Sequence, residues 1–530
     1  MKYGLLLPIA VFLCGPIALA QTPYLLRVEP PPGLFHSDML FDRIGTDLYR
    51  IAGTLTGPDT AWFYQARVDA VGTVQNATML RCDSGSAGQY PSVLLPTADG
   101  GLLFSYLNAT NGTDKQTFAK LDASGAVEWA RHYPDNYGIF LNDHPTAMVE
   151  KNGHYFLLGH RQDVAPNVGW SSTMLEVDSV GACVQLHTWA DGDALSDLGR
   201  GLMRTADNGL YSVFVQRPYF GQSSYPSVSV QRWDASLQVA WSYRYALGNY
   251  HFQNHALLLQ DGGLLLSGQV RFTSGSAPFR PYFMRLDSTG QVVWSRVVLD
   301  TQLSPKAAVE EADGSFTLLL YSNTSQLMLV HLDASGALLS AIGPDALPTS
   351  AFPADLVRDG ASGEHLVRGR VTVPGNPTYL ARLDANGEYA CGVQQLTWTD
   401  SLVTPTRTAF PVTVTLSTLA SMPIGWTTAP LTLTAVDVCL STEVQAAEQK
   451  QEPACWPVPA TEELFIALGQ ATGEPLPYSI HDATGRLALN GTATATEGGV
   501  VRLDVRGLAR GAHVVVLHLP SGDRRAVMMK

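Results

Sequence analysis

The stretch Arg285-Leu286-Asp287-Ser288-Thr289-Gly290 decides the fold, because six further copies of it recur along the chain. Each copy has the form of a tight hairpin turn, in which the aspartate accepts hydrogen bonds from backbone N–H groups and, in six of the seven copies, a glycine supplies a positive φ. The copy at Asp234 has Leu237 in place of the glycine. Strand-like sequence flanks this copy at residues 282–286 and 291–297. The copies are centred on Asp69, Asp122, Asp178, Asp234, Asp287, Asp333 and Asp384.

The spacing of these turns predicts a repeat fold. A period of about 50 residues with strand content is typical of a β-propeller or a similar array. A second turn lies upstream in several units, as at Asp261-Gly262-Gly263 and Asp313-Gly314. Two hairpins give four strands, which is one blade. We therefore predict an all-β chain in which residues 21–440 form a propeller of about seven blades.

The segment from residue 396 to 440 lacks both turn signatures but still reads as strands, for example at residues 411–416 and 431–436. Three roles are open for it. It completes the last blade, closes the ring against the first blade, or forms an eighth blade. We favour seven blades.

Three tryptophans follow the turn at a fixed offset of seven residues: Trp129, Trp241 and Trp294. Because they recur at one structural position, we interpret them as aromatic plugs between neighbouring blades rather than as an aromatic surface for ligands. The pattern Ala119-x-x-Asp122-x-x-Gly125-x-x-x-Trp129 resembles the tryptophan-docking turn of quinoprotein-type propellers. That resemblance supports a propeller without implying a quinone, because no calcium and catalytic-acid pocket is recognisable. The repeats as a whole resemble those of secreted Bacteroidetes-type propellers.

The chain begins with the features of a signal peptide at residues 1–20. Lys2 supplies a positive charge, an apolar run from Leu5 to Leu13 follows, and Ala18-Leu19-Ala20 offers small residues for cleavage. The run is too short for a membrane-spanning helix, and no later segment is long enough. We therefore expect export to the periplasm and beyond, with no membrane span after the leader is removed.

The last part of the chain reads as a polar linker, residues 441–454, and a small strand-rich domain, residues 455–530. The order of its motifs resembles the type A C-terminal sorting domain of the type IX secretion system, with turns at Gly485 and Gly511 and a basic end. Trp456, Val458 and His513 depart from that pattern, which weakens its first motif. The resemblance implies a β-sandwich that the secretion machinery recognises, and a secreted or cell-surface location.

Composition limits the kinds of partner. The formal net charge of −13 argues against nucleic acid, since phosphate binding needs a basic face. Without Cys14 in the leader, five cysteines remain and no CxxC pair exists, so a zinc-ribbon cluster is not expected. Cys391 and Cys439 flank the irregular segment, and we predict a disulfide between them.

Three local patterns could suggest chemistry, and each has a simpler interpretation. Residues 82–85 (Cys-Asp-Ser-Gly) resemble a serine-protease nucleophile loop but lack its flanking glycines. His251 and His255 lie four apart, yet in a strand we expect them to share one side about two steps apart, which does not favour a metal. Asp191, Asp193 and Asp197 cluster without the spacing of a calcium loop.

The sequence thus assigns no catalytic, cofactor-binding or metal-binding residue. It favours a secreted or cell-surface propeller that binds an unknown protein or glycan, or serves in adhesion or as a scaffold. The alternative is a glycan-active hydrolase or lyase whose site lies in the propeller channel. Such a site would draw residues from several blades, which a sequence does not reveal.

Overall fold

The structure is a computed structural model of the whole chain. It divides into two compact units, Met1–Asp437 and Val438–Lys530. The residues that the structure describes are 24–45, 48–57, 61–69, 73–82, 91–110, 113–133, 147–162, 170–190, 196–217, 227–273, 277–299, 303–322, 327–344, 351–358, 364–371, 378–383, 393–396, 398–437, 455–456, 462–467, 475–482, 486–496, 500–518 and 524–529.

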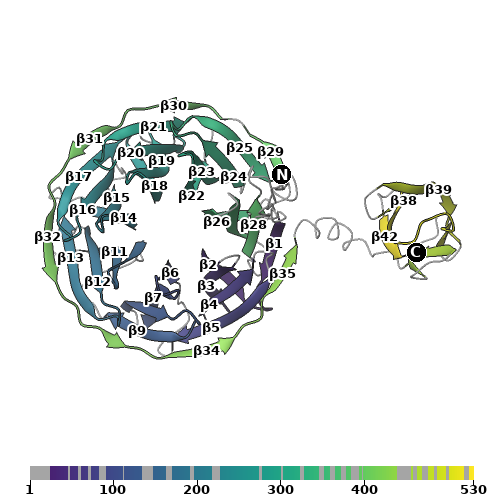
Figure 1. Ribbon diagram of the computed structural model, residues 1–530, viewed down its shortest axis with the longest axis horizontal. Helices are drawn as coiled ribbons and strands as arrows, with labels where there is room; N and C mark the ends of the chain where they lie inside the picture. The colour runs from purple at the N-terminus through teal and green to yellow at the C-terminus, as the bar shows by residue number, and fades with distance from the viewer. Residues whose placement is uncertain are drawn as a thin grey trace, which may run out of the picture. The chain divides into compact units, whose positions relative to one another are not determined.

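The first unit is a ring of seven five-stranded antiparallel sheets, so the β-propeller prediction is confirmed (Figure 1). The innermost strands of blades one to seven are β2 (Phe35–Gly45), β6 (Pro91–Pro96), β10 (Ala147–Lys151), β14 (Ser196–Arg204), β18 (Tyr250–Leu258), β22 (Leu303–Glu310) and β26 (Ala351–Arg358). Each of them contacts the innermost strand of the next blade, and β26 contacts β2, which closes the ring.

The next two strands of each blade continue the antiparallel meander outward. The second strands are β3 (Leu48–Thr56), β7 (Leu102–Thr110), β11 (His154–Gln162), β15 (Leu210–Arg217), β19 (Leu264–Arg271), β23 (Phe316–Ser322) and β27 (His365–Val371). The third strands are β4 (Ala61–Asp69), β8 (Thr113–Leu121), β12 (Trp170–Val177), β16 (Val228–Trp233), β20 (Arg280–Leu286), β24 (Leu327–Leu332) and β28 (Thr378–Leu383).

The fourth strands show how the chain closes its last blade. In blades one to six they are β5 (Val74–Cys82), β9 (Val127–Tyr133), β13 (Cys183–Ala190), β17 (Val239–Ala246), β21 (Val292–Val298) and β25 (Leu338–Pro344). In blade seven the N-terminal strand β1 (Tyr24–Glu29) takes this place and pairs with β28, with Leu26 opposite Leu380. The two ends of the propeller sequence therefore meet in one sheet.

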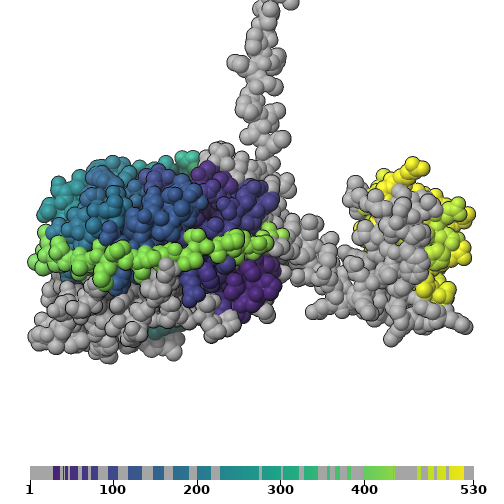
Figure 2. Space-filling view, turned by 90° about the horizontal axis from the view of Figure 1, so that it is seen from below, coloured from purple at the N-terminus to yellow at the C-terminus, as the bar shows by residue number. Residues whose placement is uncertain are grey.

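A fifth strand on the outer edge of every blade comes from residues 393–437, which we call the belt. Its strands are β29 (Val393–Gln395), β30 (Asp400–Leu402), β31 (Thr406–Ala409), β32 (Thr413–Ser417), β33 (Met422–Pro423), β34 (Trp426–Pro430) and β35 (Thr434–Asp437). They pair with blades six, five, four, three, two, one and seven in that order, so the belt runs backward around the ring. Figure 2 shows it as a continuous green band across the outer wall. The segment thus forms no blade of its own.

The belt advances seven residues per blade over most of its course. Backbone N–H groups of Leu396, Val403, Phe410, Ile424 and Leu431 donate to carbonyl oxygens on the fourth strands of blades six, five, four, two and one. At blade three the seven-residue step is not kept. There the backbone N–H of Leu419 donates to the Sγ of Cys183 instead of to a backbone carbonyl. Apolar side chains at these steps pack onto the blade cores, and Phe410 and Leu431 are buried.

The Asp-x-x-Gly turns join the third and fourth strands, as predicted. In six of the seven copies the aspartate N–H donates to the carbonyl four residues on, as Asp122 does to Ala126 at 2.8 Å. The Asp122 carboxylate in turn accepts from the N–H groups of Ser124 and Ala126. Asp384, the seventh copy, lies outside the described residues.

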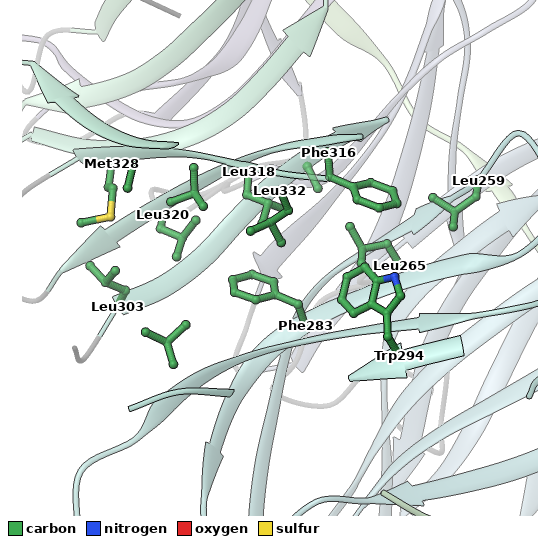
Figure 3. Close-up of a cluster of buried hydrophobic side chains, with 14 residues drawn as sticks. Leu259, Leu265, Phe283, Trp294, Leu303, Phe316, Leu318, Leu320, Met328 and Leu332 are labelled. Atoms are coloured by element: carbon green, nitrogen blue, oxygen red, sulfur yellow. The ribbon is translucent and has the colours of Figure 1, made fainter. Parts of the chain in front are cut away.

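The recurring tryptophans pack against the turn of the next blade. Trp129 Nε1 donates to the Ser179 carbonyl at 2.8 Å, and Trp294 Nε1 donates to that of Ala334 at 3.0 Å. The Trp294 ring belongs to a buried cluster that joins blades five and six, with Phe283 and Phe316 among its members (Figure 3). The interpretation of these rings as plugs between blades is confirmed.

The second unit is a small β-sandwich, as predicted. One sheet has the order β36 (Cys455–Trp456), β37 (Glu463–Ala467), β40 (Val500–Asp504). The other has the order β39 (Leu487–Thr494), β38 (Pro475–Asp482), β41 (Ala512–Leu517), β42 (Arg524–Met529). Residues of both sheets, including Leu464, Ile480 and Val515, form a separate hydrophobic core.

Two further expectations concern cysteines and the membrane. Cys391 and Cys439 both lie outside the described residues, so their predicted disulfide remains a prediction. Cys183 is a free thiol. The described chain contains no helix that is long and apolar enough to cross a membrane.

Candidate functional site

The direction of the strands gives the ring two different ends. One end, which we call the turn end, carries the tight turns between first and second strands and between third and fourth strands. The opposite end, the loop end, carries the longer connections, such as residues 272–279 between β19 and β20 and the links between blades. Because binding residues gather on loops held by a rigid scaffold, the loop end is where a ligand site is expected.

At the turn end, charged side chains tie the two hairpins of a blade together. A residue two positions before the turn aspartate reaches the first hairpin: Lys120 Nζ lies 2.7 Å from Asp99, and Arg285 lies 2.8 Å from Asp261. Partial burial would raise the pKa of Asp99, but hydrogen bonds from Lys120 and Thr97 lower it to about 2. These pairs serve the structure of the blade.

In blades three and six the residue two positions before the turn aspartate is Glu176 and His331 respectively, and contacts of histidine and glutamate lie nearby. In blade three Glu176 accepts from His154 Nδ1 at 2.7 Å. In blade six the Glu311 carboxylate lies 2.7 Å from His365 Nε2 and 2.6 Å from Thr317 Oγ1, so it joins blade six to blade seven. Partial burial opposes ionisation of Glu311, but the His365 and Thr317 contacts hold its pKa below the ordinary range. The described residues contain no group of three or more His, Cys, Asp or Glu that could hold a metal ion.

The arrangement of His251 and His255 differs from the prediction that both share one side of a strand. The pairing of β18 with β19 shifts between Gln253 and His255, because Asn254 forms a β-bulge. A bulge adds one residue and so reverses the alternation of side chains beyond it. His251 Nε2 accepts from the Leu247 N–H at 2.9 Å, whereas burial lowers the pKa of His255 to about 4.

The structure does not test the other two candidate patterns, which are residues 82–85 and the group of Asp191, Asp193 and Asp197. The loop after Cys82 and the residues Asp191 and Asp193 lie outside the described residues, and the side chain of Asp197 does as well.

Bulges of this kind recur on the innermost strands, which the sequence analysis missed. The register shifts in six of the seven inner strands, at Asp38, Ser92, Arg200, Asn254, Lys306 and Ala354. An inner strand has one edge without a partner strand, and a bulge interrupts such an edge. The signal was available in the sequence, because Ser92, Arg200, Asn254 and Lys306 each precede the first-hairpin aspartate by seven residues.

The best-described part of the loop end is an aromatic group around Arg271 in blade five, which we call the Arg271 cluster. The Arg271 guanidinium lies 3.9 Å from the centre of the Phe279 ring and 5.3 Å from that of Tyr250. The ring centres of Phe252 and Phe279 are 4.9 Å apart, and Phe272, the residue after Arg271, is 42% exposed. The cluster therefore brings partly exposed aromatic side chains and a guanidinium group to the same place.

Next to this cluster, the inner strands of blades five and six present several polar groups. Asn254 Nδ2 donates to Ser304 Oγ at 3.0 Å, and Gln269 Nε2 donates to the Leu303 carbonyl at 2.9 Å. Lys306 Nζ lies 4.7 Å from the centre of the Tyr321 ring. Burial lowers the pKa of Lys306.

Comparison with known proteins gives a fold likeness only. No protein-family model matches the sequence, and no curated protein matches it either. Among solved structures, the chain is similar to a protein of unknown function from Bacteroides caccae (13% identity, TM-score 0.32, covering 61% of this chain and 94% of that one). It is also similar to polysaccharide lyase Uly1 (10%, TM-score 0.41, 65% and 89%) and to a PL25 ulvan lyase (11%, TM-score 0.43, 67% and 95%). At these values the neighbours do not bear on the ligand of this chain, and what is established is a β-propeller.

Proposed function

We propose that the propeller is a glycan-binding protein of the cell exterior and that its ligand meets the loop end at blade five. The observation that carries this proposal is the Arg271 cluster. Aromatic ring faces stack on the apolar C–H faces of sugars, and a guanidinium fork hydrogen-bonds hydroxyl or acidic groups. Binding sites commonly combine aromatic lining with a few polar groups in this way.

The described carboxylates at the turn end have structural partners, so we propose no hydrolytic site at that end of the ring. A glycosidase needs two carboxylates free to exchange protons with the substrate. The turn-end carboxylates Asp99, Asp261 and Glu311 each have a cation or histidine partner. The backbone amides of their own turns hold Asp287 and Asp333.

The test is binding of the full chain to a glycan array, followed by titration of the best ligands. The variants Phe279→Ala and Arg271→Gln should each weaken binding at least tenfold, because each removes a contact to the sugar. A tenfold loss corresponds to about 1.4 kcal/mol. The matched control is Phe35→Ala, which removes an exposed aromatic ring from blade one. Equal binding by all three variants would contradict the proposal. Release of shorter glycan fragments would instead identify the alternative, a hydrolase or lyase.

We further propose that residues 1–20 direct export and that the C-terminal unit is a sorting domain for the type IX secretion machinery. The separate hydrophobic core of this unit supports a detachable module. Fusing residues 441–530 to a foreign exported protein should carry that protein to the surface of a host with this route. Removing the unit should leave a folded propeller in the periplasm, as measured by fractionation and protease accessibility. Normal surface delivery of the truncated chain would show that the unit has another role.

A further inference from the structure

The described charges of blades five and six are separated along the axis of the ring. Their acidic side chains lie at the turn end, apart from Asp400 on the belt, which pairs with Arg296 at 2.6 Å on the outer rim. Each turn-end acid has a partner; the Glu310 carboxylate, for example, accepts from the Gln260 N–H at 2.7 Å. These acids are Asp261, Asp287, Glu310, Glu311, Asp313 and Asp333.

The loop end of the same two blades carries described cations. Arg271 is the last residue of β19, and Arg280 is the first residue of β20. Lys306 is the fourth residue of β22, counted from the loop end, and lies at the bulge of that strand. Among the described charged residues of these two blades, the loop end therefore carries the cations, and cations of this kind attract anions.

Lys306 is the member of this patch best placed to take an anion. The bulge after Pro305 sets it apart from the regular alternation of β22, and Tyr321 flanks its amine on one side. No carboxylate among the described residues lies within ion-pair distance of it. Its side chain is partly buried, and a charge-assisted hydrogen bond is stronger there than in bulk water. Two residues before it on the strand, the Ser304 hydroxyl accepts a hydrogen bond from Asn254 of the neighbouring blade.

We propose that Lys306, Arg271 and Arg280 form an anion-binding site at the loop end of blades five and six, which takes the carboxylate or sulfate groups of an acidic polysaccharide. This inference rests on the proposed glycan binding and names the class of glycan. The Arg271 cluster supplies the stacking surface for the sugar rings. Lys306 makes the site prefer a polysaccharide that carries acidic groups.

The test compares three probes on the purified full chain: dextran sulfate, polygalacturonate and neutral dextran. Lys306→Met should weaken binding of at least one acidic probe tenfold or more and leave neutral dextran unchanged. Lys306→Arg, which keeps the charge, should retain most of the affinity. The matched control is Arg204→Gln, which makes the same change of net charge on an exposed side chain near the turn end. The two acidic probes show whether carboxylate or sulfate is preferred.

A second measurement needs no polysaccharide. Trace acetylation of lysines, read by mass spectrometry, should show protection of Lys306 by sodium sulfate relative to sodium chloride at equal ionic strength. If sulfate protects Lys306 but no glycan binds, the anion site stands and the proposed glycan function fails. If glycans bind the Lys306→Met chain as well as the parent, or if sulfate gives no protection, the anion site is overturned while glycan binding stands.

Discussion

Replacing Gly336 by alanine tests how the blades are held together. Gly336 has a φ of +78°, and a Cβ atom there would lie 2.8 Å from the Trp294 ring of the preceding blade. Gly314 makes a matched control, because its φ is +81° but the nearest atom to a Cβ would be 3.9 Å away. Both variants place an alanine in the left-handed region, which costs about 1–2 kcal/mol. Only Gly336→Ala also forces the tryptophan to move, and overpacking of this kind costs about 1–3 kcal/mol more.

The assay is urea unfolding of the full chain, with the free energy of unfolding taken by linear extrapolation. Gly336→Ala should lose about 2–5 kcal/mol and Gly314→Ala about 1–2 kcal/mol. Adding Trp294→Leu should remove most of the excess, because the smaller side chain makes room for the new methyl group. Equal losses in the two glycine variants, or no coupling with Trp294, would refute the view that the ring docks on the next turn.

Three further outcomes are expected. Glu364→Gln breaks the ion pair between Glu364 and Arg382, whose side chains are both nearly fully buried, and should lower the free energy of unfolding by about 3–5 kcal/mol in the same urea assay. Asp261→Asn, at a half-exposed carboxylate paired with Arg285, should lower it by less than about 1 kcal/mol. Because His255 has a folded pKa of about 4 and an ordinary value of 6.5, the unfolded state binds the proton between these pH values; stability should fall as pH drops from about 6.5 to 4, and His255→Gln should flatten that profile. A chain ending at Asp437 should fold, whereas one that also lacks residues 393–437 should aggregate through its open sheet edges, and added peptide 393–437 should suppress the aggregation.

Much of the propeller could be predicted from the sequence because its signals are local. The Asp122 turn is encoded within five residues: the carboxylate accepts from amides two and four positions on, and Gly125 has a φ of +90°. Such a turn needs no distant contact, so its sevenfold recurrence reveals the repeat. The seven-residue offset to Trp294 is equally local, since one hairpin fixes both positions.

The belt and the closing strand depended on tertiary structure. Leu396, Val403 and Leu431 mark the seven-residue step of the belt, but this step has meaning only once the distance between neighbouring blades is known. The pairing of β1 with β28 joins segments from opposite ends of the propeller sequence, which no local pattern encodes.

The Arg271 cluster and Lys306 show the same division. Each residue lies in an ordinary strand pattern and matches no motif. They become a candidate site because the ring places the loop ends of blades five and six side by side and because a bulge changes the direction of one side chain. Local turn chemistry therefore determined the repeat and its architecture, whereas the assembly of charges and rings from different blades was decided only when the ring closed.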